Sequence, residues 1–305
     1  MALTEAEYIW MNGELVPWGD ARVHVLTHGL HYGTGVLEGT RVYATPDGPA
    51  VFRLDDHIDR LYRSAHIMRM RLPYGKEQLR QASLELVRSN GHQACYLRHL
   101  ANVGYGAMGI DPRANPIDVM VASWEWGAYL GEEAVQRGVR LMVSSWRRND
   151  ANVVPPVAKA TGPYLNSVLA KLEALEAGFD EAVLLSGTGM VSECSGENIF
   201  VVVDGTLITP PVNAGALQGI TQSTVFTLAA ELGLPVRVDN LVRSDLYTAD
   251  EVFLSGTAAE LTPVRSIDHR EVGEPGPITR QLMGLFDDVV HGRSPLSEKW
   301  LTRVS

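Results

Sequence analysis

The sequence has few cysteines, no long apolar run and no block of basic residues. Cys95 and Cys194 lie far apart and form no disulfide framework, and we interpret Cys95 as a core residue. The start, MALTEAEYIW, lacks the segments of a signal peptide, and no apolar run approaches the roughly 18 residues that span a bilayer. The 36 acidic residues exceed the 26 basic ones, giving a net charge of −10. These features argue against a membrane or nucleic acid as partner and predict a cytoplasmic protein.

Several common catalytic motifs are also absent. The chain contains no GxSxG, HExxH, CxxC or GxxxxGK[ST], which removes the commonest hydrolase, zinc-enzyme and nucleotidase interpretations. His24, His28 and His31 have a spacing that would gather three imidazoles on a helix. However, RVHVL alternates like a strand and Gly29 should interrupt any helix. We therefore predict no metal site.

Composition and pattern predict two domains of the α+β class. The 305 residues are 45% apolar and 20% charged, enough for a sizeable core. Strands and helices mix without a regular βαβ alternation, which indicates mixed sheets with flanking helices. The polar, glycine-flanked piece GAYLGEEAVQRG has a poor core face. We place the small domain at 1–126, an interdomain loop at 127–137 and the large domain at 138–305.

Local signals predict individual elements within these domains. Asn12-Gly13 and Asp204-Gly205 stand between β-prone runs and indicate hairpins. An amphipathic helix is expected from about Leu54, with Asp55 or Asp56 as its N-cap. A second helix should begin near Pro163 and end at Gly178. Its predicted apolar face consists of Leu165, Val168, Leu169 and Leu172.

Lys159 is the first candidate for chemistry. It lies in VVPPVAKATGP, among small and apolar neighbours and with no acidic residue close in sequence. A lysine is usually a solvated surface charge. A buried amine at this place would instead lose its charge readily and act as a nucleophile, and Tyr164 follows at a helix start to supply a phenol.

Two glycine-containing turns and one acid are further candidates. GALQGIT, residues 215–221, and Ser255-Gly256-Thr257-Ala258 place small and hydroxyl residues where backbone amides bind phosphate, although such residues also simply begin helices and turns. Glu193, in MVSECSGENIF, is either a solvated turn carboxylate or a buried acid that faces a basic ring nitrogen.

Together these segments resemble the branched-chain-amino-acid aminotransferases, which are fold type IV pyridoxal-phosphate (PLP) enzymes. The resemblance runs through nearly the whole chain. The matching segments are HGLHYGTGVLEGTRVY, VFRLDDHIDRLYRSA, CYLRHLANVG, EWGAYLG, AKATGPYLNS, VSECSGENIFVV, LQGIT and DEVFLSGTAAELTPV. The resemblance implies a two-domain fold type IV aminotransferase.

The resemblance also implies cofactor-binding roles. Lys159 corresponds to the catalytic lysine that binds PLP covalently, Glu193 to the acid that pairs with the pyridine nitrogen, and Tyr164 to the phenol beside O3′. Leu217 corresponds to the residue packed against the ring. The residues that match the phosphate-binding group are Arg60, Ile220, Thr221 and Thr257. Pattern alone would not have selected Arg60, which lies off the apolar stripe of its helix.

Substrate-binding roles follow from the same resemblance. Tyr96, Thr257 and Ala258 match the binders of the α-carboxylate, and Arg98 with Tyr32 and Tyr129 matches the group that receives a second carboxylate. The apolar wall corresponds to Tyr32, Trp126 and Tyr164, and Arg41 fits the branched-chain pattern. Met108 and Ile110 match the loop that reaches a partner subunit's site in a homodimer. Leu37 departs from the usual phenylalanine, which should enlarge the pocket.

The implied reaction is a transamination in two halves. The freed amine of Lys159 moves the proton of the substrate Cα, a keto acid leaves, and a second keto acid reverses the steps. L-leucine, L-isoleucine and L-valine with 2-oxoglutarate are the expected substrates, and branched-chain amino-acid biosynthesis is the expected setting. Alternatives of the same fold are a transaminase of D-amino acids or (R)-amines and a lyase. A non-enzymatic binding protein would leave Lys159, Tyr164 and Glu193 together unexplained.

Overall fold

The computed structural model describes residues 3–127, 130–131 and 136–304. The chain forms two compact units. The first consists of Met1–Trp126, Ala158–Gly162 and Val289–Ser305, and the second of Gly127–Val157 and Pro163–Asp288. Each unit combines strands with helices, which confirms the predicted α+β class.

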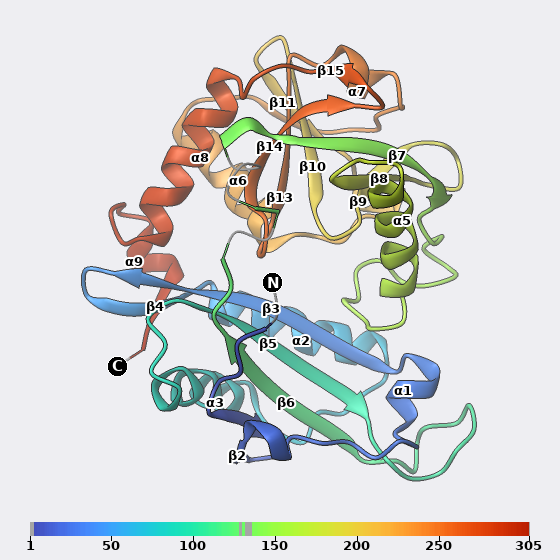
Figure 1. The fold of residues 1–305 in the computed structure, drawn as a ribbon, viewed down its shortest axis with the longest axis vertical. Coiled ribbons are helices and arrows are strands. Elements are labelled where there is room, and N and C mark those ends of the chain that lie inside the picture. The colour runs from blue at the N-terminus through green and yellow to red at the C-terminus, as the bar shows by residue number, and fades with distance from the viewer. Residues whose placement is uncertain (1–2, 128–129, 132–135, 305) are drawn as a thin grey trace. The chain divides into compact units, whose positions relative to one another are not determined.

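An antiparallel seven-stranded sheet forms the first unit. Its strands, in spatial order, are β16 (Leu301–Arg303), β4 (Gly48–Phe52), β3 (Gly35–Thr45), β5 (Cys95–Val103), β6 (Ile117–Trp124), β1 (Tyr8–Met11) and β2 (Glu14–Pro17). Helices α2 (Leu54–Ile67) and α3 (Lys76–Ser89) lie along one face of this sheet (Figure 1). Between helices and sheet, Val36, Leu61, Leu79 and Leu97 are fully buried. The unit also contains η1 (Trp18–Asp20), α1 (His28–Tyr32) and α9 (Ser297–Trp300).

A mixed nine-stranded sheet forms the second unit. Its strands, in spatial order, are β12 (Val236–Val238), β11 (Thr206–Thr209), β10 (Asn198–Val203), β13 (Glu251–Gly256), β14 (Glu260–Ile267), β7 (Val139–Arg147), β8 (Glu181–Leu185) and β9 (Val191–Cys194), with β15 (Arg270–Glu271) beside β14. The helical segments are α5 (Tyr164–Glu176), η2 (Val212–Ala214), α6 (Ile220–Glu231), α7 (Asp245–Thr248) and α8 (Pro277–Val290), whose last two residues lie in the first unit. Helix α5 packs on β7 and β8 (Figure 1).

Both predicted hairpins are confirmed. Asn12 and Gly13 have φ of 50° and 102° between β1 and β2, and Asp204 and Gly205 have φ of 49° and 74° between β10 and β11. Positive φ at both turn positions is what a tight two-residue hairpin requires, and Asn, Asp and Gly adopt it at low cost.

The predicted N-cap of α2 is wrong. The helix begins at Leu54 after Arg53, whose φ of 53° is left-handed, and Asp55 and Asp56 lie inside its first turn. The two carboxylates therefore act on the positive end of the helix dipole rather than as caps. Arg53 Nε binds Asp56 Oδ2 at 2.7 Å, which links the residue before the helix to its first turn.

The predicted apolar face of α5 is a real stripe, but it is not the buried face. Ser167, Ala170 and Ala174 pack inward, so the helix approaches the sheet through small side chains. Leu165, Val168 and Leu172 are 67%, 50% and 49% exposed. Periodicity reports that one face is apolar, and it does not report which neighbour covers that face.

The prediction for RVHVL and Gly29 is also wrong. Residues 22–26 form no strand, and Val25 is 75% exposed. Gly29 lies within α1, a single turn that ends at Gly33 with a left-handed φ of 63°. A helix this short tolerates glycine because tertiary contacts hold it.

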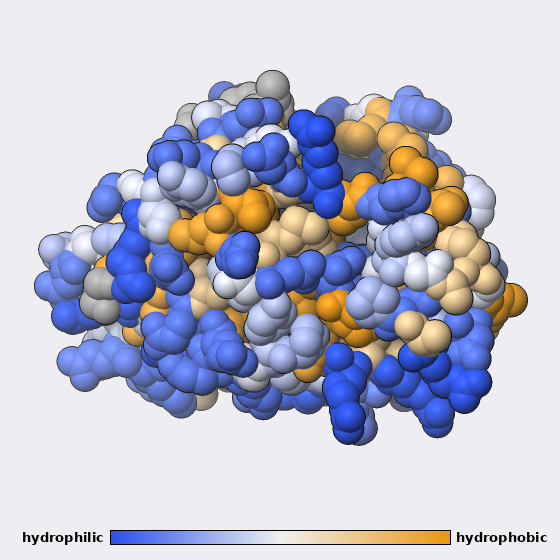
Figure 2. Space-filling model, turned by 90° about the horizontal axis from the view of Figure 1, so that it is seen from below, coloured by the Kyte–Doolittle hydropathy of each residue, from blue (hydrophilic) through white to orange (hydrophobic). Residues whose placement is uncertain are grey.

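One face of the protein is mainly hydrophilic. Figure 2 shows a face on which hydrophilic side chains predominate and apolar residues form separate patches. Within the described ranges, no helix is long and apolar enough to cross a membrane.

Candidate active site

The segment that contains Lys159 lies beside strand β3 in the first unit. The Lys159 N–H donates to Ser64 Oγ on α2 at 3.0 Å, and its carbonyl accepts the Leu37 N–H at 2.9 Å. Ala160 forms an isolated antiparallel bridge with Val36. The lysine backbone is thus fixed from two sides while its side chain is half-buried.

Two glycines allow this segment to approach α1 closely. A Cβ on Gly33 would lie 2.8 Å from Gly162 Cα, closer than real contacts allow. The Thr161 hydroxyl donates to the Gly33 carbonyl at 2.9 Å, and its N–H donates to the Gly35 carbonyl at 2.9 Å. Glycine at position 33 is therefore required by both its left-handed φ and this contact.

Arg60 is held by a buried carboxylate on β3. Arg60 Nε and Nη2 lie 2.5 and 2.9 Å from the two oxygens of Glu38, and His57 Nδ1 lies 2.7 Å from Glu38 Oε2. Arg60, Glu38 and His57 are 5%, 0% and 1% exposed. The two-point contact orients the buried guanidinium and balances its charge.

Electrostatics assign the protonation states of this group. Burial alone would raise the pKa of Glu38, but the charge of Arg60 and the hydrogen bond from His57 hold it well below the usual range. Burial lowers the pKa of His57, with Glu38 opposing and Arg60 and Lys159 reinforcing that shift. Near neutral pH, an ionised Glu38 thus accepts the Nδ1–H of a neutral His57. The sequence analysis did not identify Glu38 or His57. An acidic residue inside the apolar run of β3 was the feature that could have indicated Glu38.

The predicted substrate residues of β3 and β5 share one face of the sheet. Arg41 is paired with Tyr96, and Gly39 with Arg98, in the antiparallel register. Opposite residues point to the same side, and alternation adds Leu37 to that side, while Glu38 faces the helices. A Cβ on Gly39 would lie 1.7 Å from the Tyr96 hydroxyl, so Tyr96 lies across the glycine.

Arg98 is a cation among aromatic rings. Its guanidinium carbon lies 5.5 Å from the ring centre of Tyr96 and 5.9 Å from that of Trp124. Nε is buried without a hydrogen-bond partner in the described part of the chain. The rings stabilise the charge but leave its N–H donors for an anion.

Aromatic contacts and a backbone bond place the next predicted residues. The rings of Tyr96 and Trp126 lie 4.8 Å apart, edge to face, and Arg41 Nη2 lies 3.4 Å from the Trp126 carbonyl. Tyr32, at the end of α1, is 45% exposed, and Met108 and Ile110 are 44% and 89% exposed. Tyr129 lies outside the described residues.

Glu193, in the second unit, has a defined partner for each oxygen. Oε1 lies 3.1 Å from Arg148 Nη2, and Oε2 accepts the Leu217 N–H at 2.9 Å. Arg148 Nη2 also donates to the Cys194 carbonyl at 2.7 Å, and Nη1 to Ser167 Oγ at 3.0 Å. Glu193 is therefore a largely buried, oriented carboxylate rather than a solvated turn acid. Sequence reasoning did not identify Arg148.

The loop before α6 is equally constrained. Asn198 Nδ2 donates to the Leu217 carbonyl at 2.9 Å, and a Cβ on Gly219 would lie 2.0 Å from Asn198 Oδ1. Ile220 and Thr221, 7% and 3% exposed, begin α6, so their N–H groups lie at the positive end of its dipole. Leu217 is half-buried in the same loop.

The other predicted residues of the second unit lie at element ends. Thr257 and Ala258 form the turn between β13 and β14, and Tyr164 is the first residue of α5. All three are half-buried.

The predicted site residues are thus divided between the two units. The first unit holds Tyr32, Leu37, Arg41, Arg60, Tyr96, Arg98, Met108, Ile110, Trp126 and Lys159, and the second holds Tyr164, Glu193, Leu217, Ile220, Thr221, Thr257 and Ala258. Within the first, β3 contacts the Lys159 segment and carries Glu38, which binds Arg60, on the side that faces the helices. The Arg98 group lies on the opposite side of the same sheet. Within the second, the contacts described above gather Glu193, Arg148 and Leu217.

The three histidines do not converge on one point. His28 contacts Thr34 Oγ1 and the Gly109 carbonyl, both at 2.7 Å, and His31 Nε2 contacts the Val25 carbonyl at 2.8 Å. The described residues contain no group of three or more His, Cys, Asp or Glu arranged to hold a metal ion.

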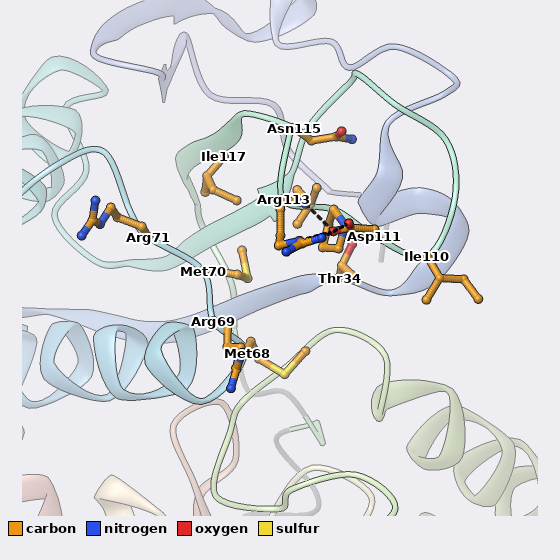
Figure 3. Close-up of a pocket in the computed structure, with 12 residues that line it drawn as sticks. Thr34, Met68, Arg69, Met70, Arg71, Ile110, Asp111, Arg113, Asn115 and Ile117 are labelled. Atoms are coloured by element: carbon orange, nitrogen blue, oxygen red, sulfur yellow. Dashed lines mark hydrogen bonds and ion pairs between the residues drawn. The ribbon is translucent and has the colours of Figure 1, made fainter.

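A cavity of about 580 Å³ opens elsewhere in the first unit (Figure 3). Its lining residues are Thr34, Met68, Arg69, Met70, Arg71, Val103, Ile110, Asp111, Pro112, Arg113, Asn115 and Ile117. Arg113 is paired with Asp111, and the guanidinium groups of Arg69 and Arg71 point away from it and from each other. Ile110 is its only lining residue among the predicted site residues, so we do not assign the chemistry to this cavity.

The chain matches a known protein family and is similar to named proteins. The family described as amino-transferase class IV matches residues 35–267. The branched-chain-amino-acid aminotransferase of Pseudomonas aeruginosa is 46% identical over 298 residues, which cover 97% of each chain.

Solved structures are similar over nearly the whole chain. The Escherichia coli branched-chain amino acid aminotransferase has a TM-score of 0.97 at 46% identity and covers 99% of this chain and 100% of its own. The branched-chain amino acid aminotransferase of T.th. has a TM-score of 0.95 with pyridoxamine 5′-phosphate, at 51% identity, and of 0.95 with N-(5′-phosphopyridoxyl)-L-glutamate, at 49% identity. In both of these complexes the match covers 99% of each chain.

Proposed function

The chain belongs to the amino-transferase class IV family, and from this membership we propose that it is a PLP-dependent branched-chain-amino-acid aminotransferase. The proposed reaction transfers the amino group of L-leucine, L-isoleucine or L-valine to 2-oxoglutarate and yields a branched-chain 2-oxo acid and L-glutamate. The similar proteins from Pseudomonas aeruginosa and Escherichia coli are named branched-chain amino acid aminotransferases.

The observation that carries the cofactor assignment is the pairing of Glu193 with Arg148 at 3.1 Å. The side chain of Glu193 is only 14% exposed, and the guanidinium of Arg148 opposes the cost of burying a carboxylate. Arg148 and the Leu217 N–H orient both of its oxygens. An oriented anion of this kind fits a protonated pyridine nitrogen, and so the residues present fit PLP.

Each unit, taken by itself, offers donor groups of the kinds that bind a phosphate. Arg60 supplies a guanidinium whose plane Glu38 fixes, Ile220 and Thr221 supply amides at the start of α6, and Thr257 supplies a hydroxyl. Leu217 would pack on the ring and Tyr164 would contact its O3′. These are the donor types that bind phosphate monoesters elsewhere.

PLP supplies an electron sink for the negative charge that develops when the substrate Cα loses its proton. Lys159 is the residue that would hold the cofactor and then accept and return that proton. Its backbone bonds to Ser64 and Leu37 fix the origin of its side chain. Fixing the backbone limits the region that the amine can reach, which favours proton transfer at a single carbon.

Arg98 supports the choice of substrates. Glutamate and 2-oxoglutarate carry a second carboxylate that leucine lacks, and the described residues offer Arg98 no anionic partner. Tyr32, Trp126 and Tyr164 would supply apolar surface for an aliphatic side chain. Tyr96, Thr257 and Ala258 would bind the α-carboxylate. Arg98 would bind the distal carboxylate with Tyr32 and Tyr129, and Arg41 fits the pattern expected of branched-chain enzymes.

We propose that the active form is at least a homodimer. Ile110 is 89% and Met108 44% exposed, and the outer face of α5 is apolar. Exposed apolar residues in such numbers are typical of protein interfaces. Sedimentation of the active protein checks this: a fully active monomer would contradict the proposal.

An activity panel tests the substrate assignment. We expect L-leucine with 2-oxoglutarate to react faster than D-alanine or (R)-1-phenylethylamine with either 2-oxoglutarate or pyruvate. Leu37, where the family usually has phenylalanine, favours a secondary activity on (R)-amines or D-amino acids as a second candidate function. A higher kcat/KM for D-alanine or the (R)-amine than for L-leucine would reverse the two assignments.

A further inference from the structure

A cluster of buried charges surrounds Cys194 in the second unit. Glu181 begins β8, Glu193 lies in β9, and Glu197 follows in the turn before β10. Val183 is paired with Cys194, so Glu181 and Glu197 lie at the same end of the β8–β9 pair. Burial raises the pKa of the Cys194 thiol well above its usual value, and Glu181, Glu197 and Glu193 raise it further. We call Glu181, Glu193, Glu197, Lys171 and Arg148 the Cys194 cluster.

Two of the three carboxylates have a cation. Glu181 Oε2 lies 2.6 Å from Lys171 Nζ, and its Oε1 accepts the Ala182 N–H at 2.7 Å. Glu193 has Arg148 at 3.1 Å and the Leu217 N–H at 2.9 Å. Each of these two carboxylates therefore has a cation and a backbone N–H as partners.

Glu197 is the exception. It is 4% exposed, and Oε2 accepts one N–H, from Gly196 at 3.1 Å. No ion pair involves it within the described residues, and its Cγ lies 3.4 Å from where a Cβ on Gly256 would stand. The charged groups that act on it are Glu181 from β8, Lys171 from α5 and Glu193 from β9. Burial, followed by the charge of Glu181, raises the pKa of Glu197 to about 8, against the opposing effect of Lys171.

The charges of the cluster do not balance without a third cation. Glu181, Glu193 and Glu197 would bring three negative charges, and Lys171 and Arg148 bring two positive ones. An uncompensated carboxylate in such a place takes up a proton, because burial disfavours its charge. A protonated ring nitrogen next to Glu193 would be the missing cation.

We propose that Glu197 carries a proton in the cofactor-free protein and releases it when the pyridine ring binds against Glu193. This inference rests on the proposed function, since it requires the ring at Glu193. The O–H bond of the Glu197 carboxyl breaks, the carboxylate keeps the electron pair, and the proton passes to the ring nitrogen or to solvent. Glu197 is thus a positioning residue. Its carboxyl group is neutral when the ring is absent and negatively charged when the protonated ring is bound.

The sign of the pH dependence follows from linkage. Below the pKa of Glu197, ring binding displaces a proton, so a rise in pH favours binding. The wild-type affinity should therefore increase with pH more steeply than that of Glu197→Gln, by up to about tenfold per pH unit between pH 6 and 8. The amide has the shape of the protonated acid and carries no proton to release.

The experiment uses pyridoxamine 5′-phosphate and the cofactor-free protein. This probe forms no covalent bond with Lys159, and its own ionisations cancel between wild type and variant. The number of protons released on binding is obtained in two independent ways. One is the change of the dissociation constant from pH 6 to 8, and the other is calorimetry in two buffers. We expect the wild type to release about one proton more than Glu197→Gln near pH 7.

Glu271→Gln is the matched control because it removes an exposed carboxylate of β15 that lies outside the Cys194 cluster. It should keep the pH-dependent affinity of the wild type, whereas Glu197→Gln should lose that component. Equal pH slopes and equal proton release in wild type and Glu197→Gln would overturn the inference, as would loss of the slope in Glu271→Gln. If the wild type binds no pyridoxamine 5′-phosphate at all, the proposed function fails instead.

Discussion

Arg98→Leu should separate recognition of the second carboxylate from recognition of an aliphatic side chain. Arg98 lies 5.5 Å from the ring centre of Tyr96 and 5.9 Å from that of Trp124, in a half-buried position. Replacement removes two contributions. Loss of the stacking interaction, about 0.5–2 kcal/mol, affects the fold of the pocket for every substrate. Loss of a charge-assisted hydrogen bond, roughly 1.5–3 kcal/mol, affects only a substrate with a distal carboxylate.

The ratio of two half-reactions isolates the second contribution. In single-turnover experiments, kcat/KM for L-glutamate should fall about 10- to 150-fold more than kcat/KM for L-leucine. Arg98→Lys should give an intermediate loss, because it keeps the charge but not the planar fork. Arg237→Leu, which removes an exposed arginine paired with Asp239, is a control and should change neither rate. Equal losses for both amino acids in Arg98→Leu would refute the assignment and make Arg98 structural.

Three further substitutions test other parts of the site. Glu193→Gln should keep bound cofactor but slow Cα deprotonation about 10- to 150-fold in stopped-flow measurements, and an unchanged rate would make Glu193 a turn residue. Glu38→Gln should lower the free energy of unfolding in urea by about 3–5 kcal/mol at pH 7, because Arg60 loses its buried partner. Since folding lowers the pKa of Glu38, this difference should shrink as the pH falls below about 4, and a loss under about 1 kcal/mol at pH 7 would contradict the buried pair. Leu37→Phe should reduce kcat/KM for (R)-1-phenylethylamine about tenfold relative to L-leucine, whereas an unchanged ratio would remove Leu37 from the pocket.

The sequence predicted local features well where neighbouring residues determine them. Asn12-Gly13 and Asp204-Gly205 form their hairpins because turn geometry depends on two residues alone. The partial burial of Lys159 also follows from its small neighbours. Its place beside β3, through Leu37 and Ser64, depends on segments about a hundred residues away and left no local pattern.

The electrostatic partners of the site could not be predicted locally either. Arg60 looked like a solvated charge because it lies off the apolar stripe of α2, and it is buried because Glu38 comes from another element. Arg148 reaches Glu193 from the loop after β7 in the same way. The outer face of α5 shows the converse: Leu165 and Leu172 form a clear stripe, yet the sheet packs on Ala170. Periodicity describes one helix, whereas burial depends on what packs against it.

The most direct test of the account is to locate the covalent bond to the cofactor. The purified protein is incubated with PLP, reduced with borohydride, digested and analysed by mass spectrometry. We predict a phosphopyridoxyl group on Lys159 and its loss in Lys159→Ala, together with loss of transamination by at least about 10²- to 10⁴-fold. An unmodified Lys159 peptide, or near-normal activity in Lys159→Ala, would contradict the central claim.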